Sequence, residues 1–429
     1  MKRCILTILL VALLVSSMAF AKTKLTFAVH WSDYQVEGIK DKEGNVVTKG
    51  LRQYVEEYMA SNPDIEIEIQ MVPFGEYLTR ILVGRLAGAA SDIYVLYSLW
   101  GVQLVESGVL DKVPKEVATA IKNDFVEAAV GGATINGEIR GIPTEVANYA
   151  LVYNKKILKA GGYDEPPKTW DELIDMASKL TIKKEDGTVQ QYGYVYDTSS
   201  NSGTVHPYLA RLYSLGGQLF SNDNKKCLLD SKEAIQALDA EIEIFRRGGT
   251  DSAATHGDFQ NGRAAMVILA PWWESSLKIA FGDQYEETIG VAPIPPMKDP
   301  KSVSYTWFVG VDALSKNKKE AWKFLEWFCI EPLPNGATRM GEFLANNIGA
   351  IPSRKADLDA FPDKLNDLYT SVYVQELANT VPEPNVAQGE EIKNIIWREI
   401  IEARHQRKTP EKALSDAKRQ IDEILSEFY

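Results

Sequence analysis

Apolar residues in the first part of the chain follow two spacings, one typical of strands and one typical of helices. Residues 65–69 alternate isoleucine with glutamate, which predicts a strand with one buried face. Residues 24–29 and 92–96 predict two further strands. Between the strands, residues 51–59 and 74–87 place apolar side chains on one face of a helix. This β-α-β-α-β order predicts an α/β fold with a mostly parallel sheet flanked by helices.

A second α/β lobe is expected to begin within residues 137–180. Pro143 interrupts regular structure, and residues 149–153 form an apolar and aromatic run that suits a buried strand. Thr169 and Glu172 then form a Thr-x-x-Glu capping box, which predicts the start of a helix.

The alternation of strands and helices continues to the end of the chain. Residues 192–196 predict a strand, and residues 231–246 predict a long amphipathic helix. Residues 267–269 predict a strand that leads into Ala270-Pro271-Trp272-Trp273. Thr409-Pro410 supplies the N-cap and first residue of a final helix.

Length and charge limit the classes of protein to consider. The 429 residues are enough for two or more domains, with 45% hydrophobic and 25% charged residues. The net charge is −12, and it becomes −14 when Lys2 and Arg3 are removed. This balance argues against binding to nucleic acid or to anionic lipid through bulk charge.

The first 21 residues have the pattern of a cleaved signal peptide. Lys2 and Arg3 precede an apolar run over 5–15, and Ala19-Phe20-Ala21 fits a cleavage site. The run is too short for a membrane anchor, and Cys4 precedes it, so Cys4 is not a lipid-bearing cysteine. We therefore expect a secreted, soluble protein. Beyond this segment the chain has Cys227 and Cys329, whose spacing does not decide whether they pair.

Recognisable catalytic and cofactor motifs are missing from the sequence. There is no G-x-S-x-G elbow, no P-loop and no G-x-G-x-x-G, so no catalytic residue and no cofactor is predicted. No two histidines have metal-ligand spacing, so no metal site is predicted; the four are His30, His206, His256 and His405. Carboxylates are abundant, so a glycosidase pair stays open.

An ordered set of short motifs resembles the extracellular solute-binding proteins of ABC importers, the family that includes maltodextrin-binding proteins. Gly141-Ile142-Pro143, Tyr153-Asn154-Lys155 and Pro166 to Glu172 match its motifs in order. Phe259 to Met266 resembles its Phe-x-x-Gly-x-Ala-Ala-Met element, and the Pro271-Trp272 pair stands where the family places a Pro-Trp. Ser91-Asp92 departs from the family's Pro-Asp.

The resemblance implies a fold, a function and partners. The expected fold is the two-lobed type II periplasmic-binding-protein fold, with lobe one formed by 22–144 and 275–330 and lobe two by 145–274 and 331–429. The expected function is capture of a mono- or oligosaccharide and its delivery to the permease subunits of an ABC transporter. The protein is expected to be a monomer without catalytic activity.

Aromatic residues at the ends of predicted strands are the candidate ligand contacts. A sugar ring has an apolar C–H face that stacks on an aromatic side chain, and its hydroxyls need nearby donors and acceptors. The resemblance places a ligand-stacking tryptophan at Trp272, whereas Trp170, Trp322, Trp327 and Trp397 lie on predicted helices and suit the core, and His30 suits packing at a strand end. The full candidate set is Trp31, Asp33, Tyr34, Tyr97, Ser98, Trp100, Glu145, Asn148, Tyr149, Tyr196, Asp197, Trp272, Trp273 and Trp307.

Two alternatives differ in chemistry. A polar non-sugar solute, such as a glycerol phosphoester or a polyol, is the first; a phosphoester would need arginine or lysine among contacts that are mainly aromatic and acidic. A secreted glycoside hydrolase is the second, and it would need two carboxylates placed across one bond.

Overall fold

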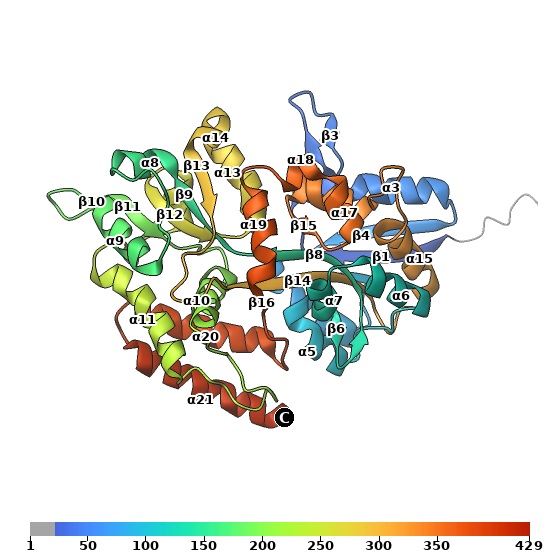
Figure 1. The fold of residues 1–429 in the computed structure, drawn as a ribbon. Helices are drawn as coiled ribbons and strands as arrows, with labels where there is room; N and C mark the ends of the chain where they lie inside the picture. The colour runs from blue at the N-terminus through green and yellow to red at the C-terminus, as the bar shows by residue number, and fades with distance from the viewer. Residues whose placement is uncertain (1–21) are drawn as a thin grey trace, which may run out of the picture. The chain divides into compact units, whose positions relative to one another are not determined.

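The computed structural model describes residues 22–429, so the predicted signal peptide lies outside the described residues. These residues form two compact units (Figure 1). Unit one contains the described residues up to Tyr94 together with Val311–Phe324. Unit two contains Val95–Gly310 and Leu325–Tyr429.

Unit one contains the predicted β-α-β-α-β segment. Strand β1 (Thr23–Val29) pairs in parallel with β4 (Ile65–Met71) and with β5 (Ile93–Tyr97), whose last three residues belong to unit two. Helices α3 (Leu51–Ser61) and α4 (Phe74–Leu86) connect the three strands, and α2 (Asp33–Glu37) with the β2–β3 hairpin (Ile39–Lys40 and Val46–Thr48) precedes α3. The predicted strands and helices of this segment are therefore confirmed.

Unit two contains a group of strands around β14. Strand β14 (Ser302–Val311) pairs antiparallel with β8 (Ile142–Asn148) and parallel with β16 (Thr380–Pro382). Strand β15 (Ile351–Pro352) pairs antiparallel with β8, and β5 follows β14 in the strand order.

Unit two also contains a separate five-stranded sheet. Its order is β10-β11-β12-β9-β13, with bounds Ile182–Lys183, Val189–Val195, Ala264–Leu269, Ala150–Asn154 and Ile289–Ala292. Only β11 and β12 run parallel; the other three pairings are antiparallel. Both sheets are therefore mixed. The predicted parallel arrangement is confirmed for β1 with β4 and β5, for β14 with β16 and for β11 with β12.

The pairing of β13 with β9 bears on the expected lobes. It joins 289–292 to 150–154, which the sequence analysis assigned to different lobes. The pairing of β14 with β8 likewise joins 304–307 to 145–148, which were also assigned to different lobes. Lobe boundaries depend on such long-range pairings, so the lobe assignment stays a prediction.

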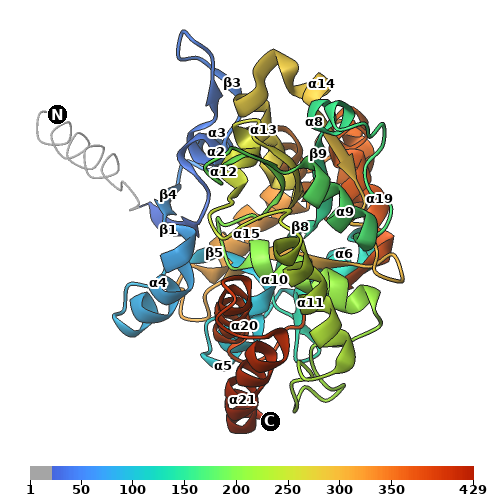
Figure 2. The same cartoon turned by 90° about the vertical axis from the view of Figure 1, so that its left-hand side faces the viewer.

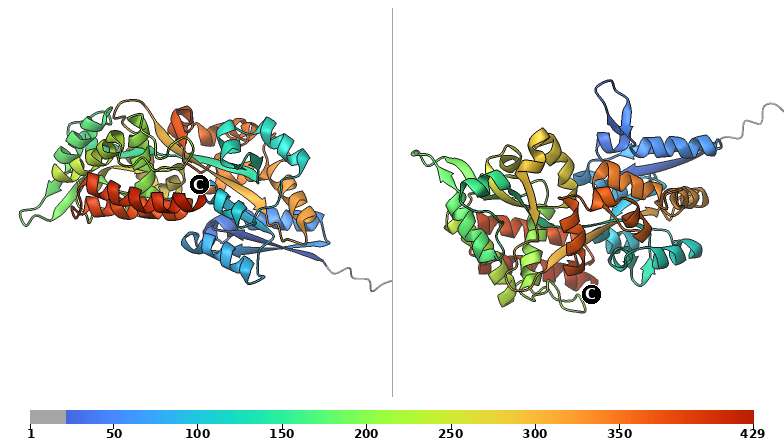
Figure 3. Two further views of the ribbon diagram at one scale, coloured as in Figure 1. Left: turned by 90° about the horizontal axis from the view of Figure 1, so that it is seen from below. Right: turned by 45° about the horizontal axis from the view of Figure 1, so that its top comes forward.

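Four helices of unit two pack against one another: α10 (Ser202–Ser214), α11 (Lys232–Arg246), α20 (Gly389–Arg404) and α21 (Pro410–Phe428). Figures 2 and 3 show α20 and α21 side by side. Glu241 of α11 joins three of these helices, because it forms ion pairs with Arg211 of α10 and with Arg404 of α20, the latter at 2.5 Å. The Thr409 side chain caps α21, as predicted.

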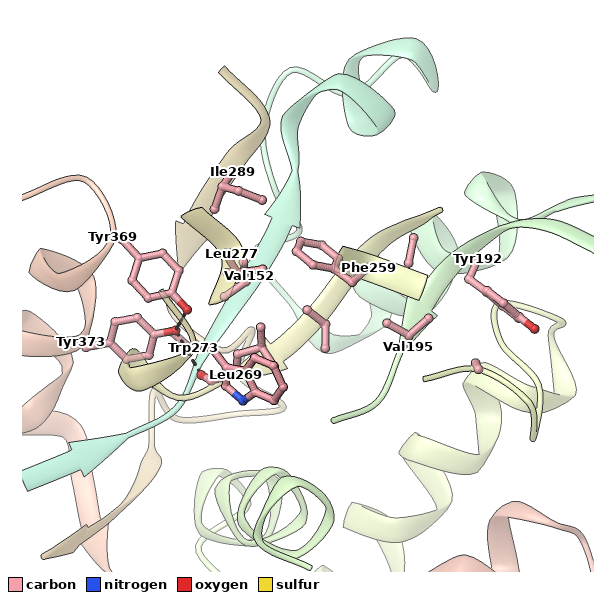
Figure 4. Close-up of a cluster of buried hydrophobic side chains, with 14 of the residues drawn as sticks. Val152, Tyr192, Val195, Phe259, Leu269, Trp273, Leu277, Ile289, Tyr369 and Tyr373 are labelled. Atoms are coloured by element: carbon pink, nitrogen blue, oxygen red, sulfur yellow. Dashed lines mark hydrogen bonds between the residues drawn. The ribbon is translucent and has the colours of Figure 1, made fainter. Parts of the chain in front are cut away.

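A buried cluster surrounds the end of β12 at Leu269, and Figure 4 shows Tyr369 and Tyr373 beside this end. Tyr373 of α19 (Thr370–Glu376) donates a hydrogen bond to the carbonyl of Leu269 at 3.1 Å, and Tyr369 donates to the carbonyl of Ala270 at 3.4 Å. The turn after β12 is therefore held by two tyrosine hydroxyls.

Helix α9 (Trp170–Leu180) begins at the predicted capping box. The Thr169 side chain accepts a hydrogen bond from the backbone N–H of Glu172 at 3.2 Å, as expected for such a box. Further helices are α6 (Lys115–Asp124), α8 (Lys155–Ala160), α13 (Glu274–Phe281), and α15 (Lys318–Cys329), which begins in unit one.

Cysteines and tryptophans complete the comparison with the sequence. Cys227 and Cys329 are both buried and free, so they do not form a disulfide. Trp170 and Trp322 are buried as expected, but Trp397 on α20 is 38% exposed, so its assignment to the core was wrong. Between residues 22 and 429 no helix is long and apolar enough to cross a membrane.

Candidate functional site

The register between β8 and β14 gathers aromatic and acidic side chains on one face of the sheet. Trp307 pairs with Glu145, and Tyr305 pairs with Ala147. Directly paired residues project to the same side, as do residues two apart along a strand. Tyr305, Trp307 and Glu145 therefore share a face of the sheet.

Two rings from the neighbouring β5 segment complete this face. The ring of Tyr97 stacks on that of Trp307, with centroids 5.3 Å apart and planes at 23°. Tyr97 also meets Trp100 and Tyr305 edge-on, each at 5.6 Å. We call Tyr97, Trp100, Tyr305 and Trp307 the aromatic cluster.

A buried ion pair lies against the aromatic cluster. Lys393 lies 2.9 Å from a carboxylate oxygen of Glu383, and it donates a hydrogen bond to the Tyr97 hydroxyl, also at 2.9 Å. His206 Nε2 lies 2.9 Å from the same Glu383 oxygen, and the His206 ring stacks on Tyr305 at 5.1 Å.

The group formed by Glu383, Lys393 and His206 carries no net charge at pH 7. Burial lowers the pKa of His206 below its ordinary value, so the imidazole is neutral at pH 7. Burial alone would raise the pKa of Glu383, but its polar and charged neighbours hold that pKa well below the usual range. Lys393 supplies the charge that balances Glu383, and the pair adds polar atoms to the cluster without net charge.

Trp272 joins the aromatic cluster from the second sheet. It lies in the short helix η2 (Pro271–Trp273) after β12, and its indole Nε1 donates to the Tyr305 hydroxyl at 3.1 Å. One face of its ring stacks on Trp273, with centroids 5.0 Å apart and planes at 27°. Trp272 is only partly buried, whereas Trp273 is 6% exposed.

Asp197 holds Trp273 rather than offering a free carboxylate. Its side chain accepts from Trp273 Nε1 at 3.1 Å and from the backbone N–H of Ser199 at 2.8 Å. Its other near neighbour is His256, at 3.8 Å. The structure thus places Asp197 behind Trp273, where it fixes the indole plane.

Glu145 has a different environment from the other acidic groups. Its carboxylate has no hydrogen bond or ion pair with any residue that the structure describes. Burial raises its pKa to about 7. Burial raises the pKa of the Tyr305 hydroxyl, and the charge of Glu145 on the same sheet face raises it further.

Three further predicted residues of unit two lie within the fold. Ser98 accepts from the backbone N–H of Thr306 at 3.3 Å, and Asn148 donates to the carbonyl of Tyr373 at 3.0 Å. Tyr149 is buried, with its ring edge-on to His206 at 5.1 Å.

Tyr196 is the predicted contact whose ring lies in a separate buried environment. It stacks on Phe245 at 5.6 Å, and the Arg404 guanidinium lies 3.8 Å from its centroid. Within residues 22–429, the Tyr196 ring has no ring contact with a member of the aromatic cluster.

The remaining predicted contacts belong to unit one. Trp31 is buried, and its ring meets Phe27 edge-on at 6.5 Å. Asp33 and Tyr34 are exposed at the start of α2. His30, expected to pack at the strand end, meets Phe74 and Tyr77 edge-on, and burial lowers its pKa to about 3.

Sequence reasoning missed Tyr305, His206, Glu383 and Lys393. The sequence could have predicted Tyr305, because it stands two residues before Trp307 in the same strand and therefore lies on the same face. The other three come from α10, the segment after β16, and α20. No local spacing relates them.

A cavity of about 370 Å³ lies elsewhere in unit two, and none of the predicted contacts lines it. Glu274, one of the acidic side chains that line it, is paired with Lys278 at 2.7 Å and accepts from Tyr285 at 3.1 Å. Within residues 22–429 no group of three His, Cys, Asp or Glu side chains is placed to hold a metal ion.

Comparison with known proteins agrees with the resemblance seen in the sequence. The family of bacterial extracellular solute-binding proteins matches residues 44–328. A maltotriose-binding protein of Pyrococcus abyssi is 28% identical over 313 residues, which cover 70% of this chain and 63% of that protein.

Solved structures show the same fold. The GacH receptor of Streptomyces glaucescens, solved unliganded and with acarbose, has a TM-score of 0.78 and 19% identity, covering 95% of this chain and all of that one. Maltose-bound MalE3 of T. maritima has a TM-score of 0.75 and 24% identity, covering 94% of this chain and 99% of that one. The predicted type II periplasmic-binding-protein fold is thereby confirmed.

Proposed function

Because the chain belongs to the family of bacterial extracellular solute-binding proteins, we propose that it captures a carbohydrate, a mono- or oligosaccharide, and delivers it to the permease subunits of an ABC transporter. The observation that carries the carbohydrate assignment is the aromatic cluster together with Trp272, whose indole is tied to Tyr305 at 3.1 Å. The solute-binding role itself rests on the family.

The composition of this region suits a polyhydroxylated ring. Trp272 is partly exposed and offers a flat surface for the C–H face of a sugar, and the buried rings of Tyr305 and Trp307 lie on the neighbouring sheet face. Glu145 offers an acceptor without a partner in the described chain. The ammonium of Lys393 is already engaged with Glu383, with the Tyr97 hydroxyl and with His206. A phosphoester is a poorer fit, because Lys393 is already neutralised by Glu383.

The proposed contacts follow from this geometry. Trp272, Tyr305, Trp307, Tyr97 and Glu145 would contact ligand. Asp197 would act through Trp273, whose indole it holds at 3.1 Å.

We also propose that the protein does not hydrolyse its ligand. Glycoside hydrolysis needs two carboxyl groups across one bond, one of them free to act as an acid and the other as a base or nucleophile. Glu383 is locked by Lys393 and His206. Incubation of an oligosaccharide with pure protein should give no shorter products; products formed at catalytic turnover would instead establish the glycosidase alternative.

Export and processing complete the proposal. Residues 1–21 would be cleaved after Ala21, leaving a periplasmic monomer that meets the permease. Mass spectrometry of protein from its native envelope should give a mature N-terminus at Lys22. An intact Met1 or a lipid-modified N-terminus would contradict this part.

A thermal-shift screen tests the binding function. The panel should contain neutral mono- and oligosaccharides, amino sugars, polyols and glycerol phosphoesters. A ligand at 100 times its dissociation constant adds about 2.7 kcal/mol to the free energy of unfolding, which raises the melting temperature measurably. A shift with saccharides supports the proposal, and a shift confined to glycerol phosphoesters would overturn the carbohydrate assignment.

A further inference from the structure

Glu145 differs from the carboxylates of this chain that are paired inside the fold. Glu241 is paired with two arginines, Glu383 with Lys393, and Asp312 with Arg85. The Glu145 carboxylate has no such partner anywhere in residues 22–429. A carboxyl group that has no partner within the described chain and is only partly buried is open to a partner from outside the chain.

The surroundings of Glu145 are both aromatic and electronegative. Its strand position puts it on the same face as Tyr305 and Trp307, and Trp272 reaches that face through its hydrogen bond to Tyr305. The faces of aromatic rings carry negative charge in their quadrupoles and attract cations.

Cations of the chain do not compensate Glu145. The buried ammonium beside the aromatic cluster, Lys393, is paired with Glu383 at 2.9 Å. His206, which stacks on Tyr305, is neutral at pH 7 because burial lowers its pKa. Among these residues, Glu145 is therefore the carboxyl group that has no counter-charge.

We propose that the saccharide recognised by this protein carries a protonated amine, as an amino sugar does, and that Glu145 is the residue that selects it. The inference rests on the proposed carbohydrate-binding function. The ammonium would donate to the Glu145 carboxylate, while the sugar ring would lie against the cluster of Tyr305, Trp307 and Trp272.

An amine fits better than a hydroxyl for a physical reason. A hydroxyl would give Glu145 a hydrogen bond but would leave its charge uncompensated. An ammonium gives both, and a charge-assisted hydrogen bond is about twice as strong as a neutral one. Burial raises the pKa of Glu145 to about 7 in the free protein, and an adjacent ammonium would lower it again. A sugar acid would be repelled.

Calorimetric titration with matched ligand pairs tests the inference. Each pair is an oligosaccharide of glucosamine and its N-acetylated counterpart, which has the same linkage but no charge. We expect the wild-type protein to bind the amine about tenfold or more tightly than its counterpart, the size of one charge-assisted contact. Glu145→Gln should abolish that preference, and Glu138→Gln, an exposed carboxylate on β7 (Glu138–Ile139), should keep it.

The outcomes are separable. Equal or tighter binding of the uncharged counterpart by the wild-type protein overturns the inference without any variant, and leaves carbohydrate binding intact. An amine preference that survives in Glu145→Gln overturns the role of Glu145. Binding of no saccharide, charged or neutral, overturns the proposed function and this inference with it. The apo melting temperature of Glu145→Gln shows whether the variant is folded.

Discussion

The indole Nε1 of Trp272 donates a hydrogen bond to the hydroxyl of Tyr305, with 3.1 Å between nitrogen and oxygen. Trp272 follows β12 of the five-stranded sheet, whereas Tyr305 lies in β14 of the other sheet. This bond links a tryptophan expected to stack on ligand to the centre of the aromatic cluster. The orientation of the Trp272 ring therefore depends on a residue 33 positions away.

Tyr305→Phe should weaken ligand binding while changing the fold little. The variant keeps the ring that stacks on His206 but removes the acceptor for Trp272. Losing one such bond costs about 0.5–1.5 kcal/mol of stability. Tyr192→Phe, which loses a bond to Asp251 at 3.1 Å, is the matched control and should keep wild-type affinity. Calorimetry would contradict the prediction if both variants bound ligand like the wild-type protein.

Glu241→Ala should strongly destabilise the protein. The change leaves two buried guanidinium groups, Arg211 and Arg404, without their carboxylate. Breaking a buried pair in this way costs about 3–5 kcal/mol in the free energy of unfolding. Glu423→Ala removes an exposed partner of Arg419 at 3.6 Å and should have little effect. Urea denaturation compares the two, and equal small losses would show that the buried pairs do not stabilise the fold.

Stability should depend on pH through Glu145. Burial raises its pKa from 4.5 to about 7, so between these values the folded protein holds a proton that the unfolded chain has lost. The contribution of Glu145 to the free energy of unfolding therefore falls as pH rises from about 4.5 to 7, and it is constant above that range.

The matched comparison is Glu145→Gln, in which all other titrating groups are kept. The stability of the wild-type protein minus that of the variant should fall across this window in the absence of ligand. Denaturation curves at several pH values measure the difference. A difference that did not change with pH would show that Glu145 is ionised normally.

Gly193→Ala should destabilise the second sheet. A Cβ atom at Gly193 in β11 would lie 1.8 Å from the backbone oxygen of Ala177 in α9, so the helix would have to move. Such overpacking lowers the free energy of unfolding by about 1–3 kcal/mol or more. Gly75→Ala in α4, where nothing lies within 4 Å, is the control and should leave the melting temperature equal or slightly higher. Similar melting temperatures for both variants would argue against this contact between α9 and β11.

Local patterns predicted the elements well but not their long-range partners. The alternation of 65–69 and the Thr409-Pro410 cap were sufficient for β4 and α21, because the relevant physics acts within a few residues. The antiparallel pairing of β13 with β9 depends on how distant segments meet. Spacing along the chain does not contain that information.

The candidate site shows the same limit. Trp307 and Glu145 were both selected from the sequence, yet only the register of β14 against β8 places them opposite each other. Glu383 and Lys393 carry no local motif, and their buried pairing arises from the tertiary fold. Tyr196 was chosen as a strand-end residue, but its strand turns that ring toward Phe245.

Trp272→Ala tests the central claim most directly, through calorimetric affinity measured together with the apo melting temperature. Removing a stacking surface should cost on the order of 1–3 kcal/mol of binding, by analogy with base–aromatic stacking, which raises the dissociation constant about 5- to 150-fold. Because Trp272 is only partly buried, the apo protein should melt near the wild-type temperature. An unchanged dissociation constant with a sharply lowered melting temperature, corresponding to a core loss of about 3–5 kcal/mol, would show that Trp272 supports the fold and does not bind the ligand.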